Sequence, residues 1–218
     1  LRGPNSFNTY SSARIPIVET SHSRQNLRRE IRLKRQNLSL NQQREASIGL
    51  VNTLCSSPHF TQSQNIAVYL ASDGEISPLS VIEAAWAEGK QVYLPVVQAA
   101  SNDSAEKGMV FYRYDSGTPL QRNVYGIEEP IIEHSESIRA EDLDLVLLPL
   151  VAFDRQGGRL GMGGGYYDRA FEFKAGQAQL NPYLLGLAHH CQEVDSLALA
   201  AWDIPLAAVA TDMELIET

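Results

Sequence analysis

Short apolar runs that are typical of buried strands alternate with helical patterns along this chain. We predict strands over residues 65–70, 91–97, 109–114, 143–151, 183–188 and 206–211. Helices are predicted over 24–38 with Ser23 as the N-cap, over about 41–57 after Ser39, and from Ser77-Pro78 to a stop at Gly89. Strands that alternate with helices favour a three-layer, Rossmann-like α/β fold with a mostly parallel central sheet flanked by helices.

The length of 218 residues suits one such domain, which we place at 22–218. Residues 1–21 lack apolar periodicity and are rich in Ser, Asn and Pro, so we expect a flexible extension there. No apolar run approaches the roughly 20 residues that span a bilayer, and we find no secretory signal pattern. Cys55 and Cys191 lack the spacing of a zinc site or a disulfide framework, so we expect a cytoplasmic protein with no membrane partner.

A glycine-rich run at 157–169 holds six glycines among its thirteen residues. It follows a predicted apolar strand and precedes a predicted helix start, where free N–H groups gather and favour an anion. Arg159 and Arg169 add positive charge at its two ends. Tyr166-Tyr167 replaces the Lys-Ser/Thr pair of a Walker loop, and Tyr166 also stands where a dinucleotide fingerprint needs its third glycine. We interpret the run as a phosphate-binding loop, and a glycine-rich surface turn is the alternative.

A basic segment at 24–35 interrupts an otherwise acidic chain. Its six basic residues and one acidic residue contrast with the net charge of −8 for the whole protein. The spacing i, i+4, i+8 and i+11 places Arg24, Arg28, Arg32 and Arg35 on one face of the predicted helix. Like charges in a row repel one another, so either an anionic ligand or a solvated basic face accounts for them. The acidic total argues against nucleic acid as a partner.

Three polar segments directly follow predicted strands: Asp73-Gly74-Glu75, the glycine-rich run, and Thr211-Asp212. In open α/β sheets, ligands bind beyond the carboxyl ends of the strands. We therefore expect these segments to converge in one crevice although they are far apart in the sequence.

The combined pattern resembles the 5-formyltetrahydrofolate cyclo-ligase family, also called methenyltetrahydrofolate synthetases. The resemblance rests on PLVAFD at 149–154 followed by GRLGMGGGYYDR at 158–169. Further matches occur in the family's order: the basic N-terminal helix, YLA with DGEI within 69–76, YGIEEP at 125–130, LA at 187–188, WD at 202–203 and TD at 211–212. The resemblance covers roughly residues 22–218, and the combination is much more specific than any single piece.

The family resemblance implies an enzyme that converts 5-formyltetrahydrofolate and ATP to 5,10-methenyltetrahydrofolate, ADP and phosphate with Mg²⁺. It also implies that the formyl oxygen attacks the γ-phosphate, after which N10 closes the ring and phosphate leaves. The expected partners are therefore small molecules, and we expect a monomer. Two other hypotheses remain: a noncatalytic nucleotide- or anion-binding module on the same fold, and an RNA-binding protein that uses the basic helix.

The resemblance also implies roles for individual residues. Metal ligands would be Asp168 and Asp212, and the catalytic residues would be Arg159 and Asp168. ATP contacts would come from Arg24, Arg28, Arg159, Leu160, Gly161, Met162, Gly163, Gly164, Gly165, Tyr166 and Tyr167. Folate contacts would come from Leu70, Glu75, Tyr125, Met162, Gly163, Gly164, Gly165 and Tyr166. Some family members carry a basic residue at the position of Gly164, so here the charge must come from elsewhere.

Each of these side chains also has a structural interpretation. Asp168 suits the first turn of a helix, where the dipole favours an acid. Asp212 and Glu75 also read as solvated surface acids, and Tyr125 as a half-buried core tyrosine. His189 and His190 follow a predicted strand, but no serine elbow accompanies them, so we interpret them, and Cys191, as structural.

Overall fold

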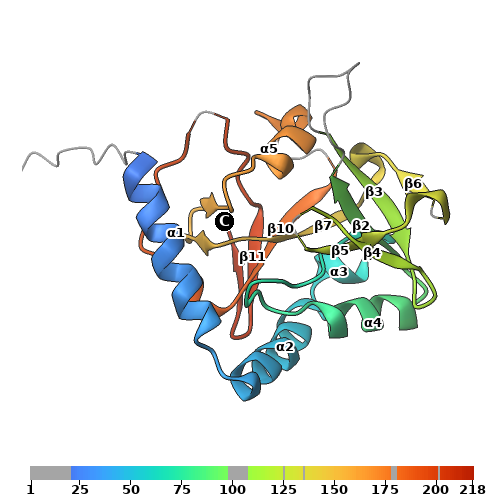
Figure 1. Ribbon diagram of the computed structural model, residues 1–218, viewed down its shortest axis with the longest axis horizontal. Helices are drawn as coiled ribbons and strands as arrows, with labels where there is room; N and C mark the ends of the chain where they lie inside the picture. The colour runs from blue at the N-terminus through green and yellow to red at the C-terminus, as the bar shows by residue number, and fades with distance from the viewer. Residues whose placement is uncertain (1–20, 98–107, 125, 135, 178–180, 201) are drawn as a thin grey trace, which may run out of the picture.

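The computed structural model describes residues 21–97, 108–124, 126–134, 136–177, 181–200 and 202–218. An eight-stranded sheet crosses the molecule (Figure 1). In spatial order its strands are β12 (Leu215–Glu217), β11 (Ala208–Thr211), β10 (Tyr183–Ala188), β7 (Leu145–Pro149), β1 (Asn65–Ala67), β2 (Gln91–Val97), β3 (Met109–Tyr114) and β6 (Ser137–Ile138). The five strands from β11 to β2 are parallel, and β12, β3 and β6 add antiparallel pairs at the two edges. This arrangement confirms the predicted α/β fold with a mostly parallel sheet.

Strand β7 shows why the centre of the sheet is stable. Successive side chains of a strand point to opposite faces, so both faces of a central strand must be apolar. Leu145 and Leu147 pack into the core on one face, whereas Val146 and Leu148 pack into the core on the other. All four are at most 1% exposed. The continuous apolar run in the sequence therefore reflects burial on both sides of the sheet.

Helices α2 (Leu40–Leu54), α3 (Pro58–Thr61) and α4 (Leu79–Ala87) cover one face of the sheet (Figure 1). Ser39 begins α2 with a capping box, as predicted. Helix α2 ends at Leu54, earlier than predicted, because Ser57 instead caps the separate turn of α3. Helix α4 begins at Leu79, so Pro78 is its N-cap residue rather than its first helical residue. The predicted stop is correct: Gly89 follows the helix with a positive φ of 73°.

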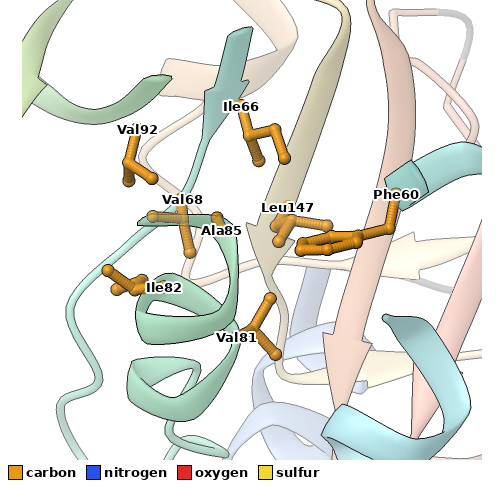
Figure 2. Close-up of a pocket in the computed structure, with 8 residues that line it drawn as sticks. All are labelled: Phe60, Ile66, Val68, Val81, Ile82, Ala85, Val92 and Leu147. Carbon is orange, nitrogen blue, oxygen red and sulfur yellow. The ribbon is translucent and has the colours of Figure 1, made fainter. Parts of the chain in front are cut away.

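The space between α4 and the sheet is filled by apolar side chains (Figure 2). It leaves no room for a water molecule, so it is a packed part of the core and not a substrate site. Its lining consists of Phe60, Ile66, Val68, Val81, Ile82, Ala85, Val92 and Leu147.

Shorter elements cover the opposite face. Helix α5 (Tyr166–Ala170) leads into Phe171, whose ring packs 5.9 Å from that of Phe111 on β3. Two hairpins lie outside the main sheet, β8 (Ala152–Phe153) with β9 (Arg159–Leu160) and β4 (Leu120–Arg122) with β5 (Glu128–Pro130). The 3₁₀ helices are Ile132–His134, Ala140–Asp142, Glu172–Lys174 and His190–Gln192. Helices thus flank the sheet on both sides, but the second layer is built largely from short turns.

Helix α1 (Ser21–Gln36) lies at one side of the molecule, next to the β8–β9 hairpin (Figure 1). Ser23 was predicted as its N-cap, but the helix already runs from Ser21, so Ser23 lies inside the first turn. Ile31 is 1% exposed and packs with Val151 and Leu160 in a small apolar cluster. Within the described residues, no helix is long and apolar enough to cross a membrane. The predicted extension at 1–21 falls almost entirely outside the described residues.

Candidate active site

The four arginines on one face of α1 all reach the body of the protein, and they divide into two pairs. Arg24 and Arg28 contact the segments around Asp203 and the glycine loop. Arg32 and Arg35 instead bind Asp73, at the other end of the helix. The basic face is therefore not freely solvated. Its arginines connect α1 to the glycine loop, to Asp203 and to the Asp73 turn.

Arg24 and Arg28 form a positively charged site that is only partly neutralised. Nη2 of Arg24 donates to Oδ2 of Asp203 at 2.6 Å, while its Nε is buried without a hydrogen-bond partner within the described part of the chain. Burial and the nearby Arg24 lower the pKa of Arg28, and Asp203 partly offsets this effect. A buried unsatisfied donor is unfavourable, and so are two neighbouring guanidinium groups. An anion placed between them would relieve both.

The glycine loop runs directly beside this charge. Nε of Arg28 donates to the carbonyl oxygen of Gly161 at 2.8 Å. Gly163 has a φ of 99°, and a Cβ there would lie 3.6 Å from the Arg28 guanidinium. Gly165 has a φ of 64° and precedes α5, whose left-handed N-cap position favours glycine. The positive φ values at Gly163 and Gly165 thus explain why glycine occupies these positions of the loop.

The context of the loop differs from the predicted strand–loop–helix unit. The strand before it is the two-residue β9 of a hairpin rather than β7 of the sheet, and α5 has only five residues. A helix this short carries a weak dipole, so most of the positive charge must come from α1. The Gly164 carbonyl accepts a hydrogen bond from Arg169 at 2.9 Å. Arg169 therefore stays at the loop, as its place in the sequence predicts.

Several loop residues that were predicted to bind ligand have buried side chains. Leu160 is 1% exposed and packs against α1, so only its backbone is available to a ligand. Arg159 is 7% exposed, and its guanidinium donates to the Ile204 carbonyl oxygen at 3.1 Å and to Asp168 at 2.5 Å. Tyr167 packs 6.4 Å from Phe171 in a stacked arrangement. In contrast, Met162 is 56% exposed.

The Asp168 carboxylate contacts the backbone of Ile204, the residue that follows Asp203. Oδ1 of Asp168 accepts hydrogen bonds from the Ile204 N–H at 3.3 Å and from Arg159. The preceding residue is Asp203, whose Oδ2 accepts from Arg24 and from a backbone N–H of its own turn at 2.8 Å. Among the described residues these bonds engage Oδ1 of Asp168 and Oδ2 of Asp203, and the second oxygen of each carboxylate could bind a cation. In the sequence, Asp203 stands out only as part of the WD match at 202–203, because it follows no predicted strand.

Asp212 lies just after β11, as predicted, but its contacts differ from those of Asp168. Its Oδ1 accepts a hydrogen bond from the His190 N–H at 2.7 Å, where the 3₁₀ helix His190–Gln192 begins. Asp168 instead contacts β9 and the segment before β11. The structure thus joins Asp168 to Asp203 through adjacent backbone and joins Asp212 to the end of β10.

Glu75 lies in the turn after β1, and its side chain is 11% exposed. Burial raises its pKa, while hydrogen bonds from Ser72 and the charge of Arg35 oppose that rise. Burial raises the pKa of Tyr167 first, and the charge of Glu75 raises it further. Arg35 hydrogen-bonds to Asp73 and to the Leu150 carbonyl oxygen, so it joins this turn to the chain that leads into the glycine loop.

The remaining predicted residues have varied positions. Leu70 is half-buried and packs against the core on the α2–α4 face. Tyr125 lies outside the described residues. His189 is 2% exposed, and its Nε2 lies 3.2 Å from the Gly74 carbonyl oxygen, so it supports the turn beside Glu75. Burial lowers its pKa, which favours the neutral ring expected of a structural histidine.

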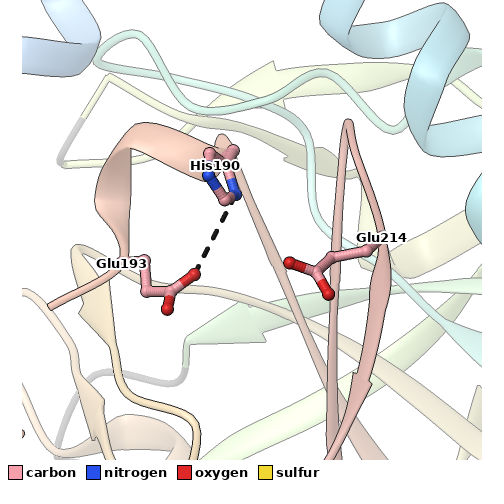
Figure 3. Close-up of side chains that lie close together, drawn as sticks. All are labelled: His190, Glu193 and Glu214. Carbon is pink, nitrogen blue, oxygen red and sulfur yellow. Dashed lines mark ion pairs between the residues drawn. The ribbon is translucent and has the colours of Figure 1, made fainter. Parts of the chain in front are cut away.

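A second group of side chains, His190, Glu193 and Glu214, places its ligand atoms within 4.8 Å of one another (Figure 3). The Arg155 guanidinium bonds to Glu193 at 2.7 Å and to Glu214 at 2.5 Å. One guanidinium already bridges both carboxylates, so we interpret this group as an ion-pair network rather than a metal site.

Comparisons with known proteins agree with the sequence pattern. The model of the 5-formyltetrahydrofolate cyclo-ligase family matches residues 20–212. The 5-formyltetrahydrofolate cyclo-ligase of Haemophilus influenzae is 38% identical over 186 residues, which are 85% of this chain and 96% of the relative. The protein of the same name from Escherichia coli K12 is 36% identical over 187 residues, which are 86% and 99% of the two chains.

Solved structures show the same likeness. The NMR structure of 5,10-methenyltetrahydrofolate synthetase from Aquifex aeolicus has a TM-score of 0.74 at 31% identity, with 89% of this chain and 92% of that chain covered. A 5,10-methenyltetrahydrofolate synthetase from Mycoplasma pneumoniae has a TM-score of 0.67 at 21% identity and shares the fold.

Proposed function

The chain belongs to the 5-formyltetrahydrofolate cyclo-ligase family, and we propose that it converts 5-formyltetrahydrofolate and ATP to 5,10-methenyltetrahydrofolate, ADP and phosphate. One observation carries this proposal beyond family membership. Arg28 bonds to the glycine loop, the neighbouring Arg24 bonds to Asp203, and the Nε–H of Arg24 is buried without a partner among the described residues. Such a site fits a multiply charged phosphate group. The relatives are named as ligases, so a noncatalytic binding module is not favoured.

The ATP phosphates fit between α1 and the glycine loop. Phosphoryl transfer depends mainly on positioning and on neutralisation of charge, with little covalent chemistry from the protein. Arg24 and Arg28 would neutralise the phosphates, and the backbone from Gly161 to Gly165 would hold them. Arg159 would act through its bond to Asp168, because its guanidinium is buried against that carboxylate.

Mg²⁺ would neutralise further phosphate charge when bound. This cation takes one or two carboxylates together with phosphate oxygens and water. Asp168 and Asp203 fit this requirement, because each keeps one carboxylate oxygen outside its hydrogen bonds and the two flank the same backbone segment. The sequence-based alternative pairs Asp168 with Asp212. Substitution of each acid distinguishes the two assignments.

The folate would occupy the region between the Asp73–Glu75 turn and the glycine loop. Glu75, in its ionised form, would accept hydrogen bonds from the N–H groups of the pterin. The exposed side chain of Met162 in the glycine loop offers an apolar contact. Contacts from Leu70, Tyr166 and Tyr125 are part of the same proposal, as are a monomeric state and a cytoplasmic location.

The test is the absorbance of methenyltetrahydrofolate in a mixture of purified protein, 5-formyltetrahydrofolate and Mg²⁺, with and without ATP. We expect the band to rise only when ATP is present. No rise, with ATP binding still detected by calorimetry, would refute the ligase activity and favour a nucleotide-binding module.

A further inference from the structure

Arg35 is a completely buried charge at the C-terminal end of α1 (0% exposed). Its guanidinium donates to the Asp73 carbonyl oxygen at 2.9 Å, to Oδ2 of Asp73 at 2.8 Å and to the Leu150 carbonyl oxygen at 3.0 Å. Buried charges are rare unless they are paired and hydrogen-bonded. These bonds tie three separate segments together: α1, the turn after β1, and the chain that leaves β7.

The turn held by Arg35 has an unfavourable backbone conformation. Asp73 has a φ of 51° and is the one non-glycine residue with positive φ in the described part of the chain. Side chains with a Cβ rarely adopt this conformation unless surrounding contacts impose it. Arg32 donates to both carboxylate oxygens of Asp73 at 2.7 and 3.0 Å, and Gln36 donates to one of them. One turn of α1 therefore imposes the conformation of the Asp73 turn.

The same turn carries Glu75, two residues further along. Oε2 of Glu75 accepts hydrogen bonds from the Ser72 N–H at 3.0 Å and from the Ser72 hydroxyl at 3.3 Å, which closes the turn around Asp73. Oε1 lies 3.7 Å from Nη2 of Arg35. The guanidinium thus faces both the backbone that orients Glu75 and the carboxylate itself.

We propose that Arg35 is a positioning residue for folate binding: it holds the Asp73 turn and keeps Glu75 oriented and ionised toward the pterin. The inference rests on the proposed function, in which Glu75 binds the folate. It assigns different tasks to the two halves of one arginine row, since Arg24 and Arg28 serve the ATP site while Arg32 and Arg35 serve the folate site.

Electrostatics makes this role measurable. Burial raises the pKa of Glu75, the positive charge of Arg35 lowers it, and the negative charge of Asp73 raises it. Two tyrosines on neighbouring elements, Tyr69 and Tyr167, also face this charge. Arg32 faces it from α1, and His189 faces the same turn from the end of β10, where burial lowers the pKa of its ring. Both tyrosines keep raised pKa values, so they stay neutral where Glu75 titrates, and the two arginines stay charged.

The experiment compares Arg35→Gln and Asp73→Asn with the wild type. Asn tolerates a left-handed backbone, so Asp73→Asn removes the charge and keeps the turn accessible. For each protein, kcat/KM for 5-formyltetrahydrofolate is measured against pH, and KM for ATP is measured separately. Arg35→Lys tests rescue of the charge without the planar guanidinium, and Arg29→Gln removes an exposed charge from the same helix as a control.

We expect Arg35→Gln to raise KM for the folate about tenfold or more, because the charge-assisted bonds that hold the Asp73 turn, and with it Glu75, are lost. KM for ATP should stay within about twofold of wild type. Its acid limb in kcat/KM should move to higher pH, since Glu75 then ionises less readily. Asp73→Asn should move that limb to lower pH. Arg35→Lys should return the acid limb of kcat/KM to its wild-type pH but leave the folate KM raised. Arg29→Gln should match the wild type in both measurements.

A uniform fall at every pH with unmoved limbs in both variants would overturn the inference, because a merely structural role predicts that result. An equal rise of the ATP and folate KM values would also overturn it. Should Arg35→Gln fail to fold, the direction of the limb in Asp73→Asn decides alone. If the wild type shows no ATP-dependent methenyl band, the proposed function fails and the inference with it; an active wild type with unmoved limbs refutes only the role of Arg35.

Discussion

Loss of the Arg28 side chain should weaken ATP binding more than folate binding. Its Nε is held by the Gly161 carbonyl oxygen at 2.8 Å, and the rest of the guanidinium lies against Gly163. The remaining N–H donors are therefore placed where a phosphate would approach the loop. Although burial and Arg24 lower its pKa, an arginine stays protonated at neutral pH. Its charge is thus present whenever ATP arrives.

The size of the effect follows from the bond that is removed. A hydrogen bond to a charged group contributes roughly 1.5–3 kcal/mol, which corresponds to about a ten- to hundredfold change in affinity. We expect Arg28→Ala to raise KM for ATP by that factor in initial rates of methenyltetrahydrofolate formation at saturating folate. Arg28→Lys should lose less, because it keeps the charge but not the planar fork.

Arg29 provides the matched control for this measurement. It neighbours Arg28 on α1, carries the same charge and is exposed. Arg29→Ala should leave KM for ATP within about twofold of wild type. An unchanged KM in Arg28→Ala, or an equal rise in both variants, would refute the argument that Arg28 faces the nucleotide.

Three other predictions concern the metal, pH and a helix cap. Asn substitution at Asp168 or Asp203 should raise the Mg²⁺ concentration that gives half-maximal rate, whereas Asp212→Asn should leave it near wild type. A Mg²⁺ titration in which Asp212→Asn raises this concentration and Asp203→Asn does not would restore the Asp212 assignment. Hydrogen bonds from Arg32 lower the pKa of Asp73 to about 2, below its value in the unfolded chain. The contribution of the ionised carboxylate to the free energy of unfolding is therefore complete above about pH 5 and is lost as the pH falls toward 2. Between these pH values, the free energy of unfolding in urea should fall by roughly 2 kcal/mol more in the wild type than in Asp73→Asn. An equal fall in both proteins would show that the Asp73 carboxylate does not contribute this stability. Ser39→Ala should lower the free energy of unfolding by about 1 kcal/mol, since it removes the capping box of α2, and an unchanged melting temperature would exclude that contribution.

Elements with strong local signals were predicted well from the sequence. The bounds of β2, β3 and β10 match the predicted ranges, and the N-cap of α2 and the glycine stop after α4 were both found. The predicted strand at 65–70 is too long, because residues 65–67 pair with β2 and only residues 66–67 also pair with β7. The missed strands have two or three residues each, as in β8, β9 and β12, which is too short for any periodicity. Their existence depends on a partner strand that the local sequence does not specify.

The site shows the same division between local pattern and tertiary placement. Helical spacing predicts that four arginines share a face of α1, but it does not distinguish the two near the glycine loop from the two that bind Asp73. That distinction comes from what packs against each turn of the helix, namely Gly161 beside Arg28 and the Asp73 turn beside Arg35. Asp203 illustrates the point further, because we consider it as a metal ligand only once the structure shows that Asp168 bonds to the N–H of Ile204, the residue that follows Asp203. The types of residue and their spacing therefore predict which chemical groups are available. The tertiary fold determines which of several arginines or aspartates lies at the site.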